Sequence, residues 1–104
     1  MLSVTILYPR APGARFDFDY YINVHMKRSA QLLGQHMLAI SVEKGLDPGA
    51  PWPPARFFAI CRFVCESRET YEAAFLSHAE ELQSDIVNYT DVTPIIQIGE
   101  IFSL

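Results

Sequence analysis

The sequence lacks the features by which proteins bind nucleic acids or membranes. Eight Lys and Arg are scattered among twelve Asp and Glu, so the formal charge is −4 and no basic run exists. Nucleic acid binding needs a concentrated cationic surface that displaces counterions, and docking on an anionic membrane needs clustered Lys or Arg as well. No apolar stretch approaches the roughly 20 residues of a membrane span. We therefore expect neither nucleic acid nor a membrane as a partner.

The N-terminus also lacks the charged flank and the small-residue cleavage site of a secretory signal peptide. A cytoplasmic location is the default expectation. No Gly-rich phosphate loop, Ser-His-Asp set or suggestively spaced carboxylate pair can be found, and neither a CxxC nor an HxxxH pattern occurs. The sequence therefore predicts no metal and no cofactor.

Cysteine is scarce, and the two present are Cys61 and Cys65. Four residues apart in a strand, they would share one face but lie about 13 Å apart at a rise of about 3.3 Å per residue. That separation is too large for a disulfide. We interpret both as small buried hydrophobic residues.

The sequence contains enough hydrophobic and aromatic residues to form a core. Half of its 104 residues are hydrophobic, and they include seven Phe, five Tyr and one Trp. This composition excludes a disordered chain, and the length suits one domain spanning residues 1–104.

Hydrophobic residues recur with period two in some segments and at spacings of three and four in others, which predicts strands and helices respectively. We expect Asp17 and Ser67 to cap the two helices and Gly34 to end the first. Residues 85–93 are expected to be irregular or a short edge strand. The predicted elements in chain order are a strand at 2–8, a helix at 17–33, strands at 37–44 and 56–66, a helix after Ser67, and a last strand at 94–104.

The order βαββαβ predicts an α+β fold of the ferredoxin-like type, a four-stranded antiparallel sheet with both helices on one face. In strand 56–66 and in the last strand, apolar residues occur on both faces. Helices cover only one face, and soluble monomers rarely leave a large apolar patch exposed. We therefore expect a second copy of the sheet to cover the other face in a homodimer.

His25 is the strongest candidate for chemistry. It falls on the apolar stripe of the first helix, one turn after Tyr21 and one before Ser29, so it should face the sheet. Histidine is the usual acid or base near neutral pH. The alternative is a core histidine whose ring bonds to a backbone carbonyl or a tyrosine hydroxyl.

Two tyrosines are candidates for the same site. Tyr8 ends the first strand, at the side where the helices begin, and Tyr21 shares the stripe of His25. A buried tyrosine usually finds a hydrogen-bond partner, so the three residues could line a polar part of an apolar pocket. The alternative is ordinary aromatic core.

The remaining polar candidates have mainly structural interpretations. Asp85 and Asn88 are turn-forming residues whose side chains can bond to nearby backbone, although Asp85 could instead orient His25. We expect His78 on the surface, and His36 at a helix C-terminus or in a loop.

Together these residues resemble the EthD family. The likeness spans nearly the whole chain in order, with one departure, because the family often has Pro after the histidine and Met26 stands here. The segments that carry it are Leu7-Tyr8-Pro9, Gly13, Phe16-Asp17, Tyr20-Tyr21, His25, the run from Asp85 to Asp91, and Pro94.

The resemblance implies a dimeric α/β barrel, whose distant relatives include polyketide cyclases, muconolactone isomerases and cofactor-free monooxygenases. The family name comes from an association with ethyl tert-butyl ether degradation, and some relatives are described as decarboxylases of aromatic polyketide-like acids. A pocket between helices and sheet is also implied.

We accordingly expect a small cofactor-free enzyme of the lyase, isomerase or oxygenase type that acts on a small apolar or aromatic metabolite. His25 would be its acid or base, and Tyr8 or Tyr21 would position a substrate oxygen. One alternative is a non-catalytic protein that binds a hydrophobic ligand or assists a monooxygenase system. Another is a dimer with a filled core and no pocket.

Overall fold

In the computed structural model, which describes residues 1–104, four antiparallel strands form one sheet in the order β2-β3-β1-β4. The central strand β1 pairs with β3 on one side and with β4 on the other, and β2 pairs with the second edge of β3. This order is that of the predicted ferredoxin-like fold. The strands are β1 (Leu2–Pro9), β2 (Ala39–Lys44), β3 (Phe57–Cys65) and β4 (Ile95–Glu100).

The first helical segment covers the predicted range but widens in its middle. Asp17 caps it, because its Oδ1 accepts the backbone N–H of Tyr20 at 3.0 Å. The uniform α-helix expected from the sequence is wrong at the centre, where the hydrogen bonds follow the wider π-helical pattern. Spacings of three and four cannot reveal such a turn. Its parts are α1 (Phe18–Tyr20), η1 (Tyr21–Met26), α2 (Lys27–Leu33) and the 3-10 turn η2 (Gly34–His36).

The second helical segment is interrupted at Ser77 and His78, where the sequence predicted a continuous helix. Ser67 caps its start as predicted, since its hydroxyl accepts the backbone N–H of Thr70 at 3.2 Å. The chain that follows is largely irregular and makes one isolated β-bridge, between Phe16 and Thr90. The parts are α3 (Arg68–Leu76), α4 (Ala79–Ser84) and the 3-10 turn η3 (Ile86–Asn88).

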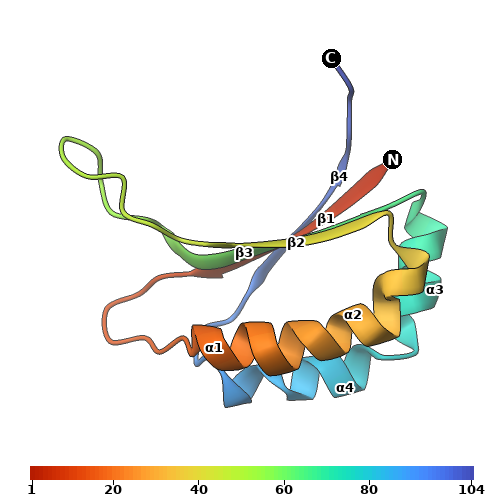
Figure 1. Cartoon of the computed structure of the whole chain (residues 1–104), viewed down its shortest axis with the longest axis horizontal. Coiled ribbons are helices and arrows are strands. Elements are labelled where there is room, and N and C mark those ends of the chain that lie inside the picture. Colours follow the sequence, from red (N-terminus) through yellow and green to blue (C-terminus); the bar gives the residue numbers. More distant parts are fainter.

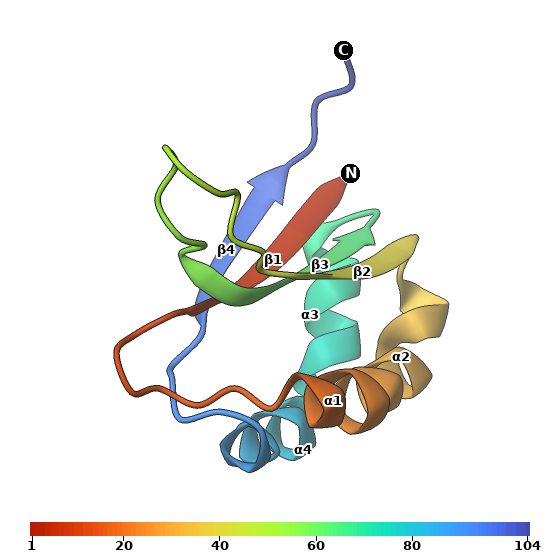
Figure 2. The ribbon, with the colours of Figure 1, turned by 60° about the vertical axis from the view of Figure 1, so that its left-hand side comes forward.

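All helices lie on one face of the curved sheet (Figure 1), and the view in Figure 2 shows both helical segments beneath it. No helix is both long and apolar enough to span a membrane. The core lies between the two layers. Most of the sheet residues that are buried in this core come from the inner face of β3. These residues are Ala59, Cys61, Phe63 and Cys65. Both cysteines are buried and unpaired, as the sequence predicted.

The other sheet face is uncovered and less apolar than the sequence suggested (Figure 1). Strand pairing aligns one polar residue from each strand into a row across its middle. Apolar side chains such as Ile60 and Leu7 lie beside this row. The prediction of a second apolar face was based on the residues of β3 and β4 alone. The register of the strand pairs places the polar side chains of β1 and β2 beside Arg62. The row consists of Ser41, Arg62, Thr5 and Gln97.

Candidate functional site

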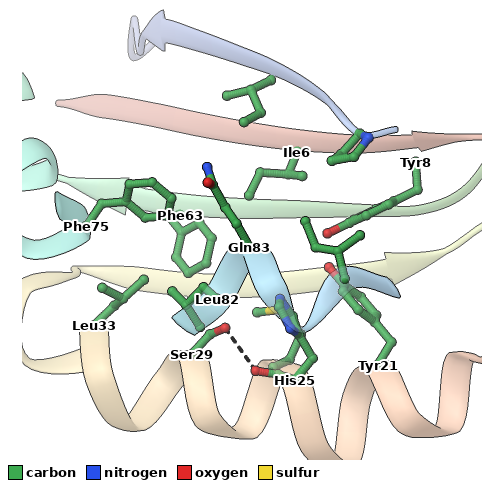
Figure 3. Close-up of a pocket in the computed structure, with 14 residues that line it drawn as sticks. Ile6, Tyr8, Tyr21, His25, Ser29, Leu33, Phe63, Phe75, Leu82 and Gln83 are labelled. Atoms are coloured by element: carbon green, nitrogen blue, oxygen red, sulfur yellow. Dashed lines mark hydrogen bonds between the residues drawn. The ribbon is translucent and has the colours of Figure 1, made fainter. Parts of the chain in front are cut away.

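A cavity of about 210 Å³ lies between the helices and the inner face of the sheet (Figure 3). Its lining is mostly hydrophobic, with a few polar groups of the kind that orient a ligand. The sheet and the segment before β4 contribute Ile6, Tyr8, Phe63, Pro94 and Ile96. The helical segments contribute Tyr21, His25, Met26, Ser29, Leu33, Phe75, Leu82, Gln83 and Ile86.

His25 lies in the wall of this cavity, on the widened turn η1. The wide turn brings Tyr21, His25 and Met26 to the buried side together, and such turns are frequent at functional sites. The ring of Tyr21 stacks on the imidazole with centroids 5.7 Å apart, and Ser29 Oγ donates to the His25 carbonyl oxygen at 2.9 Å. Packing and backbone contacts therefore fix where the imidazole lies.

The partner of the imidazole is a carboxylate and not a backbone carbonyl. His25 Nδ1 lies 3.0 Å from Asp85 Oδ2. Since a carboxylate only accepts, the neutral ring carries its proton on Nδ1 and keeps Nε2 as a free acceptor. Burial lowers the pKa of His25 below 6.5, against the opposing effect of Asp85. The ring is therefore neutral at pH 7 and able to take a proton.

Asp85 is itself held by three donors. In addition to His25, Tyr20 Oη donates to its Oδ1 at 2.6 Å, and Asn88 Nδ2 donates to the same oxygen at 2.9 Å. Partial burial raises the pKa of Asp85, but the hydrogen bonds from Asn88, Tyr20 and His25 outweigh burial, so the net pKa is lowered. The carboxylate is thus ionised and fixed in orientation, as the base-orienting member of a catalytic triad is.

Three buried tyrosines form the other polar part of the site; Tyr8 and Tyr21 line the cavity, and Tyr89 lies behind them. The hydroxyls of Tyr8 and Tyr89 are 2.7 Å apart, and burial raises the pKa of Tyr8 to about 12. The Tyr21 hydroxyl is buried and has no hydrogen-bond partner. Burial raises the pKa of Tyr21 as well. All three are neutral hydroxyls, able to donate a hydrogen bond at pH 7.

His25 also lines a second, polar hollow of about 310 Å³, which lies between the first helical segment and residues 81–88 of the second. Asp85 and Asn88 lie in its wall, and Asp85 does not line the apolar cavity. The imidazole therefore stands between the apolar cavity and a polar region open to solvent. This position lets a proton that reaches the ring exchange with water.

The structure brings together all four residues singled out in the sequence, Tyr8, Tyr21, His25 and Asp85, within one connected cluster. His36 is exposed and does not line the cavity, and His78, expected on the surface, is half-buried at the start of α4. No group of three or more His, Cys, Asp or Glu side chains is placed to hold a metal ion.

Sequence reasoning missed two tyrosines. Tyr20 lies off the apolar stripe, and it reaches the site through its hydrogen bond to Asp85 and by stacking on the ring of Tyr89. Tyr89 is fully buried, and its ring packs 4.7 Å from His25 between centroids. The sequence placed it in the segment after Asp85, directly after the turn-forming Asn88, which favoured a loop, and the family resemblance included that segment without giving Tyr89 a role.

Comparison with known proteins agrees with this fold. Residues 14–93 match the family model of the EthD domain. No curated protein matches the chain. An EthD-like protein from Ralstonia eutropha is 42% identical, with a TM-score of 0.87 over 95% of this chain and 89% of that one.

Two more distant solved structures share the fold. An ethyl tert-butyl ether degradation (EthD) family protein from Bacillus halodurans is 19% identical, with a TM-score of 0.76 over 98% of this chain and 99% of that one. A protein from Arabidopsis thaliana is 15% identical, with a TM-score of 0.70 over 100% and 98% of the two chains. With the domain match over most of its length and a relative at 42% identity, the chain belongs to the EthD family.

Proposed function

We propose that this protein is a small acid–base enzyme that moves a proton on an apolar or aromatic molecule held in the cavity. The observation that carries the proposal is the environment of His25. Its Nδ1 is bound to the Asp85 carboxylate, Nε2 makes no hydrogen bond within the protein, and the residue lines the cavity. A positioned base of this kind contributes about 10² to 10⁴ in rate.

The chemical step requires only groups of this chain and the substrate. His25 Nε2 takes a proton from a C–H or O–H group that is acidified by a neighbouring carbonyl. The electron pair left behind moves onto the carbonyl oxygen, near the Tyr8 and Tyr21 hydroxyls, and Asp85 stabilises the imidazolium. Return of the proton, at the same or another atom, completes an exchange or an isomerisation without a cofactor.

A second candidate function is binding without chemistry, since hydrophobic residues form most of the cavity wall. A carrier or accessory protein needs such a wall and has no need of a base. The pairing of His25 with a carboxylate favours the enzyme, because the carboxylate stabilises the imidazolium that forms when the ring takes up a proton.

The test is proton exchange on a carbonyl compound of suitable size. With 2-tetralone or acetophenone in deuterated buffer, the protein should accelerate loss of the proton signals beside the carbonyl, measured by NMR. Because the base must be neutral and burial lowers the pKa of His25, the acid limb of the rate profile should have its midpoint below 6.5. Exchange of both ketones no faster than in buffer alone would count against the enzyme and in favour of the binding protein.

We also propose a homodimer. Its support is the uncovered sheet face, where half-buried Ile60 and Leu7 lie in adjacent strands with no helix above them. A second sheet in the two-fold relation would remove both from water.

Light scattering should give twice the mass of one chain at micromolar concentration. Ile60→Lys places a charge in the proposed interface and should shift the mass toward the monomer, because an unpaired buried charge is costly. Leu76→Lys, at a 73% exposed position on α3, is the matched control and should leave the dimer intact. A monomeric parent protein would exclude this assembly.

A further inference from the structure

The cavity wall contains no charged side chain. None of its fourteen lining residues is Lys, Arg, Asp or Glu, and its one titratable base, His25, is already paired with the Asp85 carboxylate. An anion placed here would lose its hydration without gaining a cation as partner. Burying an unpaired carboxylate is strongly unfavourable, so the wall disfavours anions.

The cation in the neighbouring hollow, Arg28, does not change this balance. Arg28 lines the polar hollow on the far side of His25 and not the cavity. Its guanidinium is also occupied, because Nε and an Nη donate to the two carboxylate oxygens of Glu81 at 2.6 and 3.2 Å. An anionic ligand in the cavity would thus meet the negative charge of Asp85 behind the imidazole, without a free positive charge.

One polar group in the wall does need a partner. The Tyr21 hydroxyl is buried in a residue that is 1% exposed and lines the cavity, and it forms no hydrogen bond of good geometry within the protein. The Tyr8 hydroxyl and the Cys61 thiol are its polar neighbours, but neither is placed for a well-formed bond. A buried hydroxyl without a partner is destabilising. A ligand in the cavity would supply the missing partner, and an uncharged oxygen is the partner that the surrounding wall permits.

The size of the cavity limits the ligand further. An engineered apolar cavity of about 150 Å³ holds benzene. The cavity here, at about 210 Å³, has room for one ring or two fused rings with a small polar substituent. Figure 3 shows Tyr8 and Tyr21 together on one side of the site and Leu33 and Phe75 on the other. A ligand with one oxygen at one end and hydrocarbon elsewhere matches this division.

We propose that the cavity selects an uncharged molecule of one or two rings whose hydroxyl or carbonyl oxygen bonds to the Tyr21 hydroxyl, and that it rejects the corresponding carboxylate. This inference deepens the proposed function by naming the ligand class. It rests on the same cavity, but it does not require that His25 perform chemistry.

The test uses three probes with the same ring system, namely 2-naphthol, 2-naphthoate and naphthalene, with binding to the full chain measured by equilibrium dialysis at pH 7. We expect 2-naphthol to bind more tightly than naphthalene, and 2-naphthoate to bind at least tenfold more weakly than 2-naphthol. Equal or tighter binding of 2-naphthoate would overturn the inference, as would failure of all three probes to bind.

The variant Tyr21→Phe isolates the hydroxyl. It should weaken 2-naphthol binding roughly 2- to 10-fold, leave naphthalene binding unchanged, and keep or raise the midpoint of denaturation, because an orphaned group is removed. Tyr71→Phe, a half-buried tyrosine on α3 outside the cavity, is the matched control and should change neither affinity. Unchanged 2-naphthol binding in Tyr21→Phe would contradict the role of that hydroxyl.

The two proposals fail separately. If 2-naphthol binds selectively but neither ketone exchanges its protons, the ligand class stands and the acid–base function falls. If the ketones exchange while 2-naphthoate binds as well as 2-naphthol, the acid–base function stands and the ligand class falls.

Discussion

His25→Gln should fold like the parent protein and lose about 10² to 10⁴ of its rate of ketone proton exchange. Glutamine has a comparable length, and its amide can still donate to the Asp85 carboxylate that now accepts from His25 Nδ1. What it lacks is a nitrogen that can take up a proton. The measurement is the NMR exchange rate with 2-tetralone, with circular dichroism to verify the fold.

The matched control is His78→Gln. His78 is half-buried at the start of α4 and lines neither the cavity nor the polar hollow, so its variant should exchange at the parental rate. Equal rates in His25→Gln and the parent protein would show that another group is the base. An equal loss in both variants would indicate a general disturbance of the helical layer and no special role for His25.

Tyr89→Ala should cost about 3 to 5 kcal/mol of unfolding free energy, the largest stability effect that we expect from a single substitution in this chain. Its ring is fully buried and lies in the middle of an aromatic cluster, with centroids 4.9 Å from Tyr21 and 5.6 Å from Phe16. Removing it leaves a cavity that the surrounding rings cannot fill without leaving their own contacts. Urea denaturation at one fixed protein concentration measures the loss, because dimer formation would couple stability to concentration.

Tyr89→Phe separates the ring from the hydroxyl. It keeps the packing and removes only the 2.7 Å contact with the Tyr8 hydroxyl, so it should cost about 1 kcal/mol. A loss in Tyr89→Phe as large as that in Tyr89→Ala would mean that the hydroxyl pair, and not the buried ring, stabilises this part of the core.

The fold could be predicted because its signals are local. The period-two alternation in β1 and β3 and the capping side chains of Asp17 and Ser67 each act over a few residues. The chirality of βαβ connections then leaves few arrangements for the order βαββαβ. The sequence alone therefore indicated the sheet, the helical layer on one face, and the burial of His25, within a few residues at each boundary.

The site could be predicted only in part, because its decisive contacts join distant segments. His25 and Asp85 are 60 residues apart in the chain, and Tyr20 and Asp85 are 65 apart. The sequence left Asp85 as a turn residue or an orienting group, and only the packing of the segment after α4 against η1 puts the carboxylate beside the ring. The widened turn that carries Tyr21 and His25 had no sequence signal either.

By itself, then, the sequence determined what each short segment prefers: which face of each strand and helix is apolar, where helices begin, and which residues have suitable chemistry. Only the tertiary structure decided that the Asp85 carboxylate orients His25, that the Tyr21 hydroxyl remains without a partner, and that Arg62 lies in a polar row across the open sheet face. The physical reason is that hydrogen bonds and strand register are set by distances between segments, and a period in the sequence contains no information on those distances.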